Sequence, residues 1–132
     1  MNNEIISICN LDTLETSSYH VLKQGDTYAL FIKENGTFEF VIDQNSKVNF
    51  IVNEGKNVSI ICTLQNELKE VEIDFVVEKD ATCRAFIDNM QALCVKENHV
   101  VKERAKLYIG YGDLMRKKNA HHVHYNLKGK HI

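Results

Sequence analysis

One heptapeptide sets the fold class: Val71-Glu72-Ile73-Asp74-Phe75-Val76-Val77. Apolar side chains recur at every second position of this stretch, which is the period of a β-strand with one buried face. The same alternation extends along the chain in both directions. It recurs over residues 38–42, 48–52, 58–64, 105–111 and 123–127. The pattern therefore predicts an all-β protein.

Turn-forming residues separate the alternating runs at intervals of about ten residues, as in Glu34-Asn35-Gly36 and Gln44-Asn45-Ser46. Two architectures fit this spacing: an antiparallel β-sandwich or jelly roll, and a parallel β-helix in which each coil covers the one below. Among the turn sequences only Asn35-Gly36 is typical of a tight two-residue hairpin. Turn chemistry thus slightly favours the parallel β-helix.

We expect a single β domain over residues 1–132, with an N-terminal cap region at 1–24 and stacked short strands over 25–132. The segment Asn10–Leu22 is expected to hold a short helical turn, with Asp12 or Thr13 as its N-cap. Residues 89–101 show no clear period.

Composition and charge exclude several classes of protein. Of the 132 residues, 44% are hydrophobic and 26% are charged, which is ordinary for a globular domain. The net charge of −2 argues against a nucleic acid as partner. The N-terminal residues do not resemble a signal peptide and no apolar stretch is long enough to span a bilayer, so we expect no membrane association and a cytoplasmic location.

Four cysteines, Cys9, Cys62, Cys83 and Cys94, occur without any C-x-x-C pair. This spacing fits neither a zinc ribbon nor a dense disulfide framework, so free thiols are expected. Cys62 and Cys83 share their strand faces with apolar residues, which predicts buried and unreactive thiols. The role of Cys94 is left open, and no set of residues forms a catalytic signature, so we predict that the chain is not an enzyme.

His122 and His124 are the candidate metal ligands. On a strand they project from one face, and neutral imidazole binds zinc, iron or copper well. Cupin-type sites use this spacing but add a glutamate, and no acid follows Asp113. The alternative function is therefore a small metal-binding β-sandwich protein or metal-dependent enzyme using both histidines. The simpler interpretation leaves them in solvent while Val123, Tyr125 and Leu127 pack inward.

Residues 71–130 resemble part of the core of the SufB/SufD family of iron–sulfur cluster assembly proteins. The resemblance lies in the alternating strand at 71–77, the following Lys79-Asp80-Ala81-Thr82-Cys83, and the segment Glu103 to Leu114. It also includes His122-Val123-His124-Tyr125-Asn126-Leu127-Lys128-Gly129, which is similar to that family's repeating strand ending in Leu-x-Gly.

The resemblance implies a right-handed parallel β-helix that serves as a non-catalytic scaffold, paired with an ABC-type ATPase and with a SufB/SufD-like partner. Family members build an iron–sulfur cluster, so a cluster is the cofactor that the resemblance suggests, without assigning residues to it. A single metal ion is the cofactor of the alternative that uses His122 and His124. Family members are longer and contact the ATPase through a C-terminal helical region, so we expect a short, truncated relative. An open β-helix end exposes unpaired backbone groups. We therefore predict a homodimer, with Val123, Tyr125 and Leu127 at its interface.

Overall fold

The computed structural model describes residues 5–65, 68–88, 92, 94–112 and 120–127. These residues form strands and one short 3-10 helix, η1 (Ile8–Asn10). The strands are β1 (Ile5–Ser7), β2 (Leu14–Glu15), β3 (Tyr19–Gln24), β4 (Thr27–Ile32), β5 (Gly36–Ile42), β6 (Ser46–Val52), β7 (Asn57–Leu64), β8 (Glu70–Val77), β9 (Thr82–Asp88), β10 (Cys94–Val101), β11 (Lys106–Tyr111) and β12 (Ala120–Leu127). In this described part of the chain, no helix has the length and apolar character that crossing a membrane requires.

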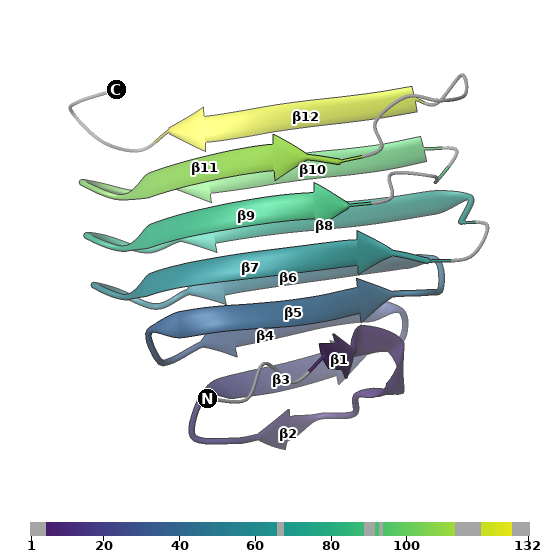
Figure 1. Ribbon diagram of the computed structural model, residues 1–132, viewed down its shortest axis with the longest axis horizontal. Helices are drawn as coiled ribbons and strands as arrows, with labels where there is room; N and C mark the ends of the chain where they lie inside the picture. Colours follow the sequence, from purple (N-terminus) through teal and green to yellow (C-terminus); the bar gives the residue numbers. More distant parts are fainter. Residues whose placement is uncertain (1–4, 66–67, 89–91, 93, 113–119, 128–132) are drawn as a thin grey trace.

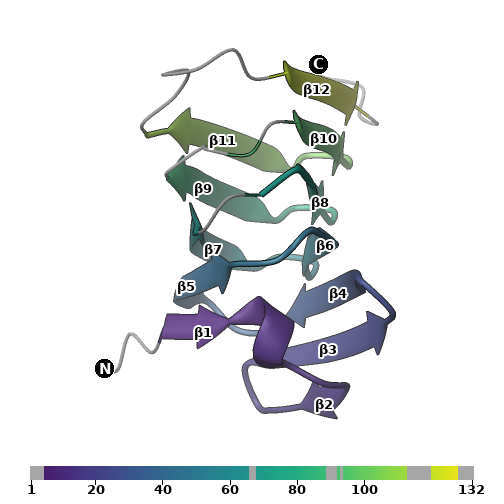
Figure 2. The same cartoon turned by 90° about the vertical axis from the view of Figure 1, so that its right-hand side faces the viewer.

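The strands build two sheets that face each other (Figure 1, Figure 2). Sheet A has the order β1-β5-β7-β9-β11, and sheet B has the order β12-β10-β8-β6-β4-β3-β2. From β4 onward the chain alternates between the sheets, and each strand pairs in parallel with the strand two elements later. The chain is therefore a parallel β-solenoid of about four coils, as expected, and the antiparallel sandwich is excluded.

The core lies between the two sheets and is built from the inward face of every strand. Parallel register places equivalent residues of successive coils on top of one another, as with Phe50 and Phe75. Five rings in consecutive contact form an aromatic ladder with centroid separations of 5.1 to 5.3 Å: Phe40, Phe50, Phe75, His99 and Tyr125. The first three rings are fully buried, so the alternation in the sequence identified the buried face correctly.

The helical turn expected over Asn10–Leu22 is not formed. The chain instead makes η1, β2 and β3, and β3 pairs antiparallel with β4 along its whole length. Hydrogen bonds from the N–H groups of Ser18 and Tyr19 to the Thr16 hydroxyl, at 3.2 and 3.0 Å, tighten the turn before β3. Strand pairing with the neighbouring β4 outweighs the weak local preference for a helix.

The hairpin and corner positions also differ from expectation. The tight hairpin lies at Gly25, which joins β3 to β4 and has a φ of 61°. Asn35-Gly36 is instead a corner of the solenoid, leading from β4 to β5. A second corner repeats in three coils with a left-handed residue each time: Gly55, Asp80 and Arg104. The Arg104 guanidinium donates to Asp80 Oδ1 at 2.6 Å, which joins two of these corners.

Asn45 connects two coils through its side chain. Its Oδ1 accepts hydrogen bonds from the backbone N–H groups of Lys69 and Glu70, at 2.8 and 3.3 Å, where β8 begins. We expect Asn45→Ala to lower the free energy of unfolding by about 1 kcal/mol, because two N–H groups lose their acceptor at a partly solvated site. Chemical denaturation measures this change. Asn45→Asp keeps the oxygen, so a loss as large as that of the alanine variant would contradict the assignment.

Candidate functional site

The last described strand of each sheet lies at the C-terminal end of the solenoid. There β11 pairs only with β9, and β12 pairs only with β10, among the described residues. Sheet B extends one strand further than sheet A, so this end has the shape of a step (Figure 2). We call this region, formed by β11 and β12, the open end.

The inward face of β12 is exposed at the open end. Val123, Tyr125 and Leu127 are 38%, 50% and 46% exposed, whereas nearly all the inward residues of the inner coils are fully buried. Their sequence pattern is that of a core strand, but no described strand lies opposite them in sheet A. The structure therefore places the three predicted interface residues together on one unpaired apolar surface.

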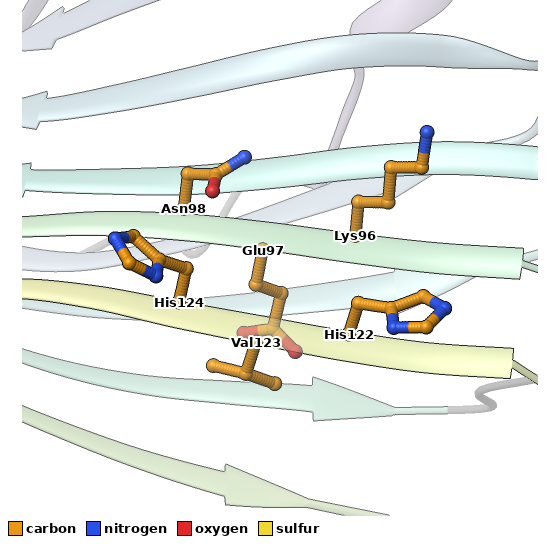
Figure 3. A pocket seen from close by; sticks show the side chains of 6 residues that line it. All are labelled: Lys96, Glu97, Asn98, His122, Val123 and His124. Carbon is orange, nitrogen blue, oxygen red and sulfur yellow. The ribbon is translucent and has the colours of Figure 1, made fainter.

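His122 and His124 lie on the outer face of β12. Parallel register sets them beside Lys96 and Asn98 of β10, and these four side chains border a shallow hollow of about 150 Å³. Figure 3 shows the two imidazoles turned away from each other. No group of three or more His, Cys, Asp or Glu side chains that could hold a metal ion occurs among the described residues. The two histidines thus border the same hollow, but no third ligand from the described residues joins them. Metal binding stays a prediction.

A polar cluster formed by Glu97, His99 and Tyr111 lies at the base of the open end, with Tyr111 contributed by β11. The side chains of Glu97 and His99 are fully buried, and His99 Nε2 lies 2.7 Å from Glu97 Oε1. The Tyr111 hydroxyl donates to both carboxylate oxygens of Glu97, at 3.0 and 2.9 Å. The backbone N–H of Phe75 donates to His99 Nδ1 at 3.0 Å. The cluster therefore connects β8, β10 and β11.

These contacts fix which nitrogen of His99 carries its hydrogen. Because Nδ1 accepts from Phe75, the ring hydrogen lies on Nε2 and is donated to Glu97. Burial and then the negative charge of Glu97 raise the pKa of the Tyr111 hydroxyl far above its usual range, so it stays a donor. A polar cluster satisfied in this way is tolerated in a core because each group has a partner.

The cysteines occupy two kinds of environment. Cys62 and Cys83 are buried on inward faces, as predicted. Burial raises the pKa of both thiols to about 12, with a further contribution at Cys62 from the charge of Glu97. Cys9 and Cys94 are half-buried free thiols. The two buried thiols therefore stay protonated, which makes them poor nucleophiles.

Sequence reasoning missed the polar cluster, although a signal was present. Val95, Glu97 and His99 follow the period of two that marks an inward face, with two polar residues in apolar positions. Because the segment before Cys94 shows no clear period, this alternation was not recognised. A glutamate and a histidine at inward positions of a strand are uncommon unless they are paired.

Fold and site define a β-solenoid with an open end above a buried polar cluster. Comparison of the chain with protein-family models, with curated proteins and with solved structures found no match.

Proposed function

We propose that this chain is a cytoplasmic, non-catalytic scaffold of the SufB/SufD type that takes part in iron–sulfur cluster assembly through its open end. The observation that carries the proposal is the exposed inward face of β12, with Val123, Tyr125 and Leu127 on a strand whose outer edge is unpaired among the described residues. A strand of this kind attracts another extended chain, because its backbone groups and its apolar face are both left to be covered.

A second copy of the chain fits the step at this end. From β4 onward, the strands of sheet A and those of sheet B run in opposite directions (Figure 1). A two-fold axis parallel to the strands would set β12 of each protomer above β11 of its partner, in antiparallel pairing. The β12 strand of one copy then lies beside β11 of the other copy and extends its sheet A by one strand. Both apolar faces become buried, which is the self-complementary contact that a two-fold dimer requires.

The solenoid architecture and the resemblance of residues 71–130 support the more specific role. In this proposal the partners are an ABC-type ATPase and a SufB/SufD-like protein, which could replace the second copy at the open end. His122 and His124 are the residues that we propose for a metal, since they share the hollow beside that end (Figure 3).

We expect the double variant Val123→Asp/Leu127→Asp to shift the protein from dimer to monomer at micromolar concentration. Two carboxylates on the face to be buried would meet their own copies across the two-fold axis, at a cost of several kcal/mol. Sedimentation equilibrium measures the change. Asn126→Asp adds a charge on the outer face of the same strand and serves as the matched control, expected to stay dimeric. A monomeric wild-type protein would contradict the dimer.

The assembly role has its own test. Anaerobic purification followed by iron, sulfide and zinc analysis, together with co-purification with an ABC-type ATPase, should give iron with sulfide and a stable complex. Zinc at one per chain, lost in His122→Ala/His124→Ala, would instead support a plain metal protein. A dimer without iron, sulfide or bound ATPase would retain the interface and refute the assembly role.

A further inference from the structure

The junction between β8 and β10 differs from the other junctions in sheet B. Between β6 and β8, parallel register is continuous over the whole of β6. Between β8 and β10, register holds at Cys94–Lys96 and at Val100–Val101 but is interrupted over Glu97–His99. The middle of this junction is therefore not held by a regular backbone ladder.

Two side chains take the place of backbone acceptors there. Inside the solenoid, His99 Nδ1 accepts from the Phe75 N–H at 3.0 Å. On the outer face, Asp74 Oδ1 accepts from the Asn98 N–H at 2.7 Å. Each bond joins β8 to β10. Cohesion at this point thus depends on two side chains, and one of them, Asp74, is a carboxyl group that can lose or gain a proton.

The outer contact includes a second carboxyl group. Glu72 and Asp74 lie two residues apart on the outer face of β8, and the Asn98 side chain donates to Glu72 Oε2 at 3.0 Å while its backbone N–H donates to Asp74. Two ionised carboxylates held by the same residue repel each other, so the pair is more stable when one of them keeps a proton. Asp74 is buried although it lies on the outer face. Because burial penalises a charged carboxylate, the proton of the pair is held by Asp74 and not by the more exposed Glu72.

The charged groups around the pair come from every neighbouring strand. Lys47 of β6 approaches Glu72 Oε2 at 3.7 Å, and Lys96 of β10 is paired with Glu70 at 3.2 Å. His122 and His124 of β12 lie one strand further, in register with Lys96 and Asn98. The positive charges thus favour an ionised Glu72 and leave Asp74 as the group that holds the proton.

We propose that Glu72, Asp74 and Asn98 form a proton-operated joint between β8 and β10, closed when the carboxyl pair holds its proton and loosened when the proton is lost. On release the proton passes to bulk water, and the two carboxylates repel each other. Asp74 then moves toward solvent, and the Asn98 N–H loses its acceptor. The joint holds β10, which is the strand that pairs with β12, so its state controls how firmly β10 and the open end above it are held.

The electrostatics of the pair agree with a transition near neutral pH. Burial, opposed by the Asn98 N–H and reinforced by Glu72, raises the pKa of Asp74 to about 7. Burial alone would raise the pKa of Glu72, but hydrogen bonds from Asp74 and Asn98, with the charge of Lys47, hold it below its usual range. The folded state keeps a proton that unfolded aspartate releases near pH 4. The contribution of Asp74 to stability therefore falls as pH rises from about 4 to 7 and is constant above that range.

Amide hydrogen exchange measured by NMR at pH 6 and pH 8 tests the joint. After division by intrinsic exchange rates, protection of the Asn98 amide should fall about tenfold at pH 8, because opening becomes easier. The amide of Glu78, which donates to Val52 across the β6–β8 junction, is the internal reference and should not change. An equal fall at both amides, or none at Asn98, would overturn the proposal.

Two variants test whether the change in Asn98 protection comes from the proton on the Glu72–Asp74 pair or from another effect of pH. Asp74→Asn can accept from Asn98 and donate to Glu72, so it imitates the protonated pair, and its Asn98 protection should be equal at both pH values. Glu72→Gln removes the like charge, so Asp74 ionises at lower pH and the midpoint of the change in Asn98 protection should move to lower pH. A persistent tenfold change in the asparagine variant, or an unmoved midpoint in the glutamine variant, would refute the joint. The glutamine variant suffices if the asparagine variant does not fold.

Discussion

Replacing His99 by phenylalanine should lower the free energy of unfolding by about 4 kcal/mol, although phenylalanine fits the aromatic ladder by size. The substitution removes the acceptor of the Phe75 N–H and the donor that faces Glu97. Glu97 then keeps Tyr111 but loses its closest partner while its side chain stays fully buried. The free energy change measured by urea denaturation at neutral pH tests this prediction.

A compensated variant distinguishes lost hydrogen bonds from poor packing. In Glu97→Val/His99→Phe the carboxylate is gone, and the inward face of β10 carries the apolar residue types found in β8, as at Ile73 and Phe75. We expect the double variant to recover about 2 kcal/mol or more of the loss, because apolar replacement of a buried charged pair is often nearly neutral. His20→Phe, at a less buried ring that contacts Phe31 at a tilt, is the control and should change little. A double variant as unstable as His99→Phe would show that shape, not charge, explains the loss.

Much of the fold was predictable because strand alternation is a local property. Residues 71–77 show it directly, and the inward residues of β6, β7 and β8 were assigned correctly. The choice between sandwich and solenoid was not local, because both give the same period of two. The choice depends on which strands pair, as shown by the parallel pairing of Phe50 with Phe75, and on the conformation of the corners between strands. The repeated left-handed corner was hidden because Asp80 and Arg104 occupy positions where glycine would have signalled it.

The site was predictable only in its apolar part. The alternation at Val123, Tyr125 and Leu127 marked an inward face, but exposure of that face depends on how far the described strands of sheet A extend relative to those of sheet B. The joint at Asp74 was hidden for a different reason. An aspartate between apolar residues indicates an outer, solvated position, and its burial follows from contacts with Asn98, 24 residues away in the sequence. The alternation in the sequence indicates which face of the strand a side chain lies on, but it does not indicate which distant residues the side chain contacts.

Phe75→Ala should destabilise the protein by about 4 kcal/mol, the usual cost of removing a fully buried phenylalanine. Phe75 is stacked between Phe50 and His99, with ring centroids 5.3 and 5.2 Å away, so its loss leaves a cavity in the middle of the aromatic ladder. The inner hydrogen bond at its backbone N–H also depends on the position of His99. Thermal and chemical denaturation should both report the loss.

The matched control is Phe86→Ala, which removes the same side chain from the outer face of sheet A. Phe86 is 41% exposed and rests on Gly110 and Gly112, where an added Cβ would approach its ring to 3.2 and 2.8 Å. Its removal should cost about 1 kcal/mol, since little apolar area leaves contact with the core. Each coil of a solenoid is stabilised mainly by its neighbours, so a cavity at Phe75 should also loosen β10 and the open end. Equal losses at the two positions would mean that the aromatic ladder does not hold the coils together.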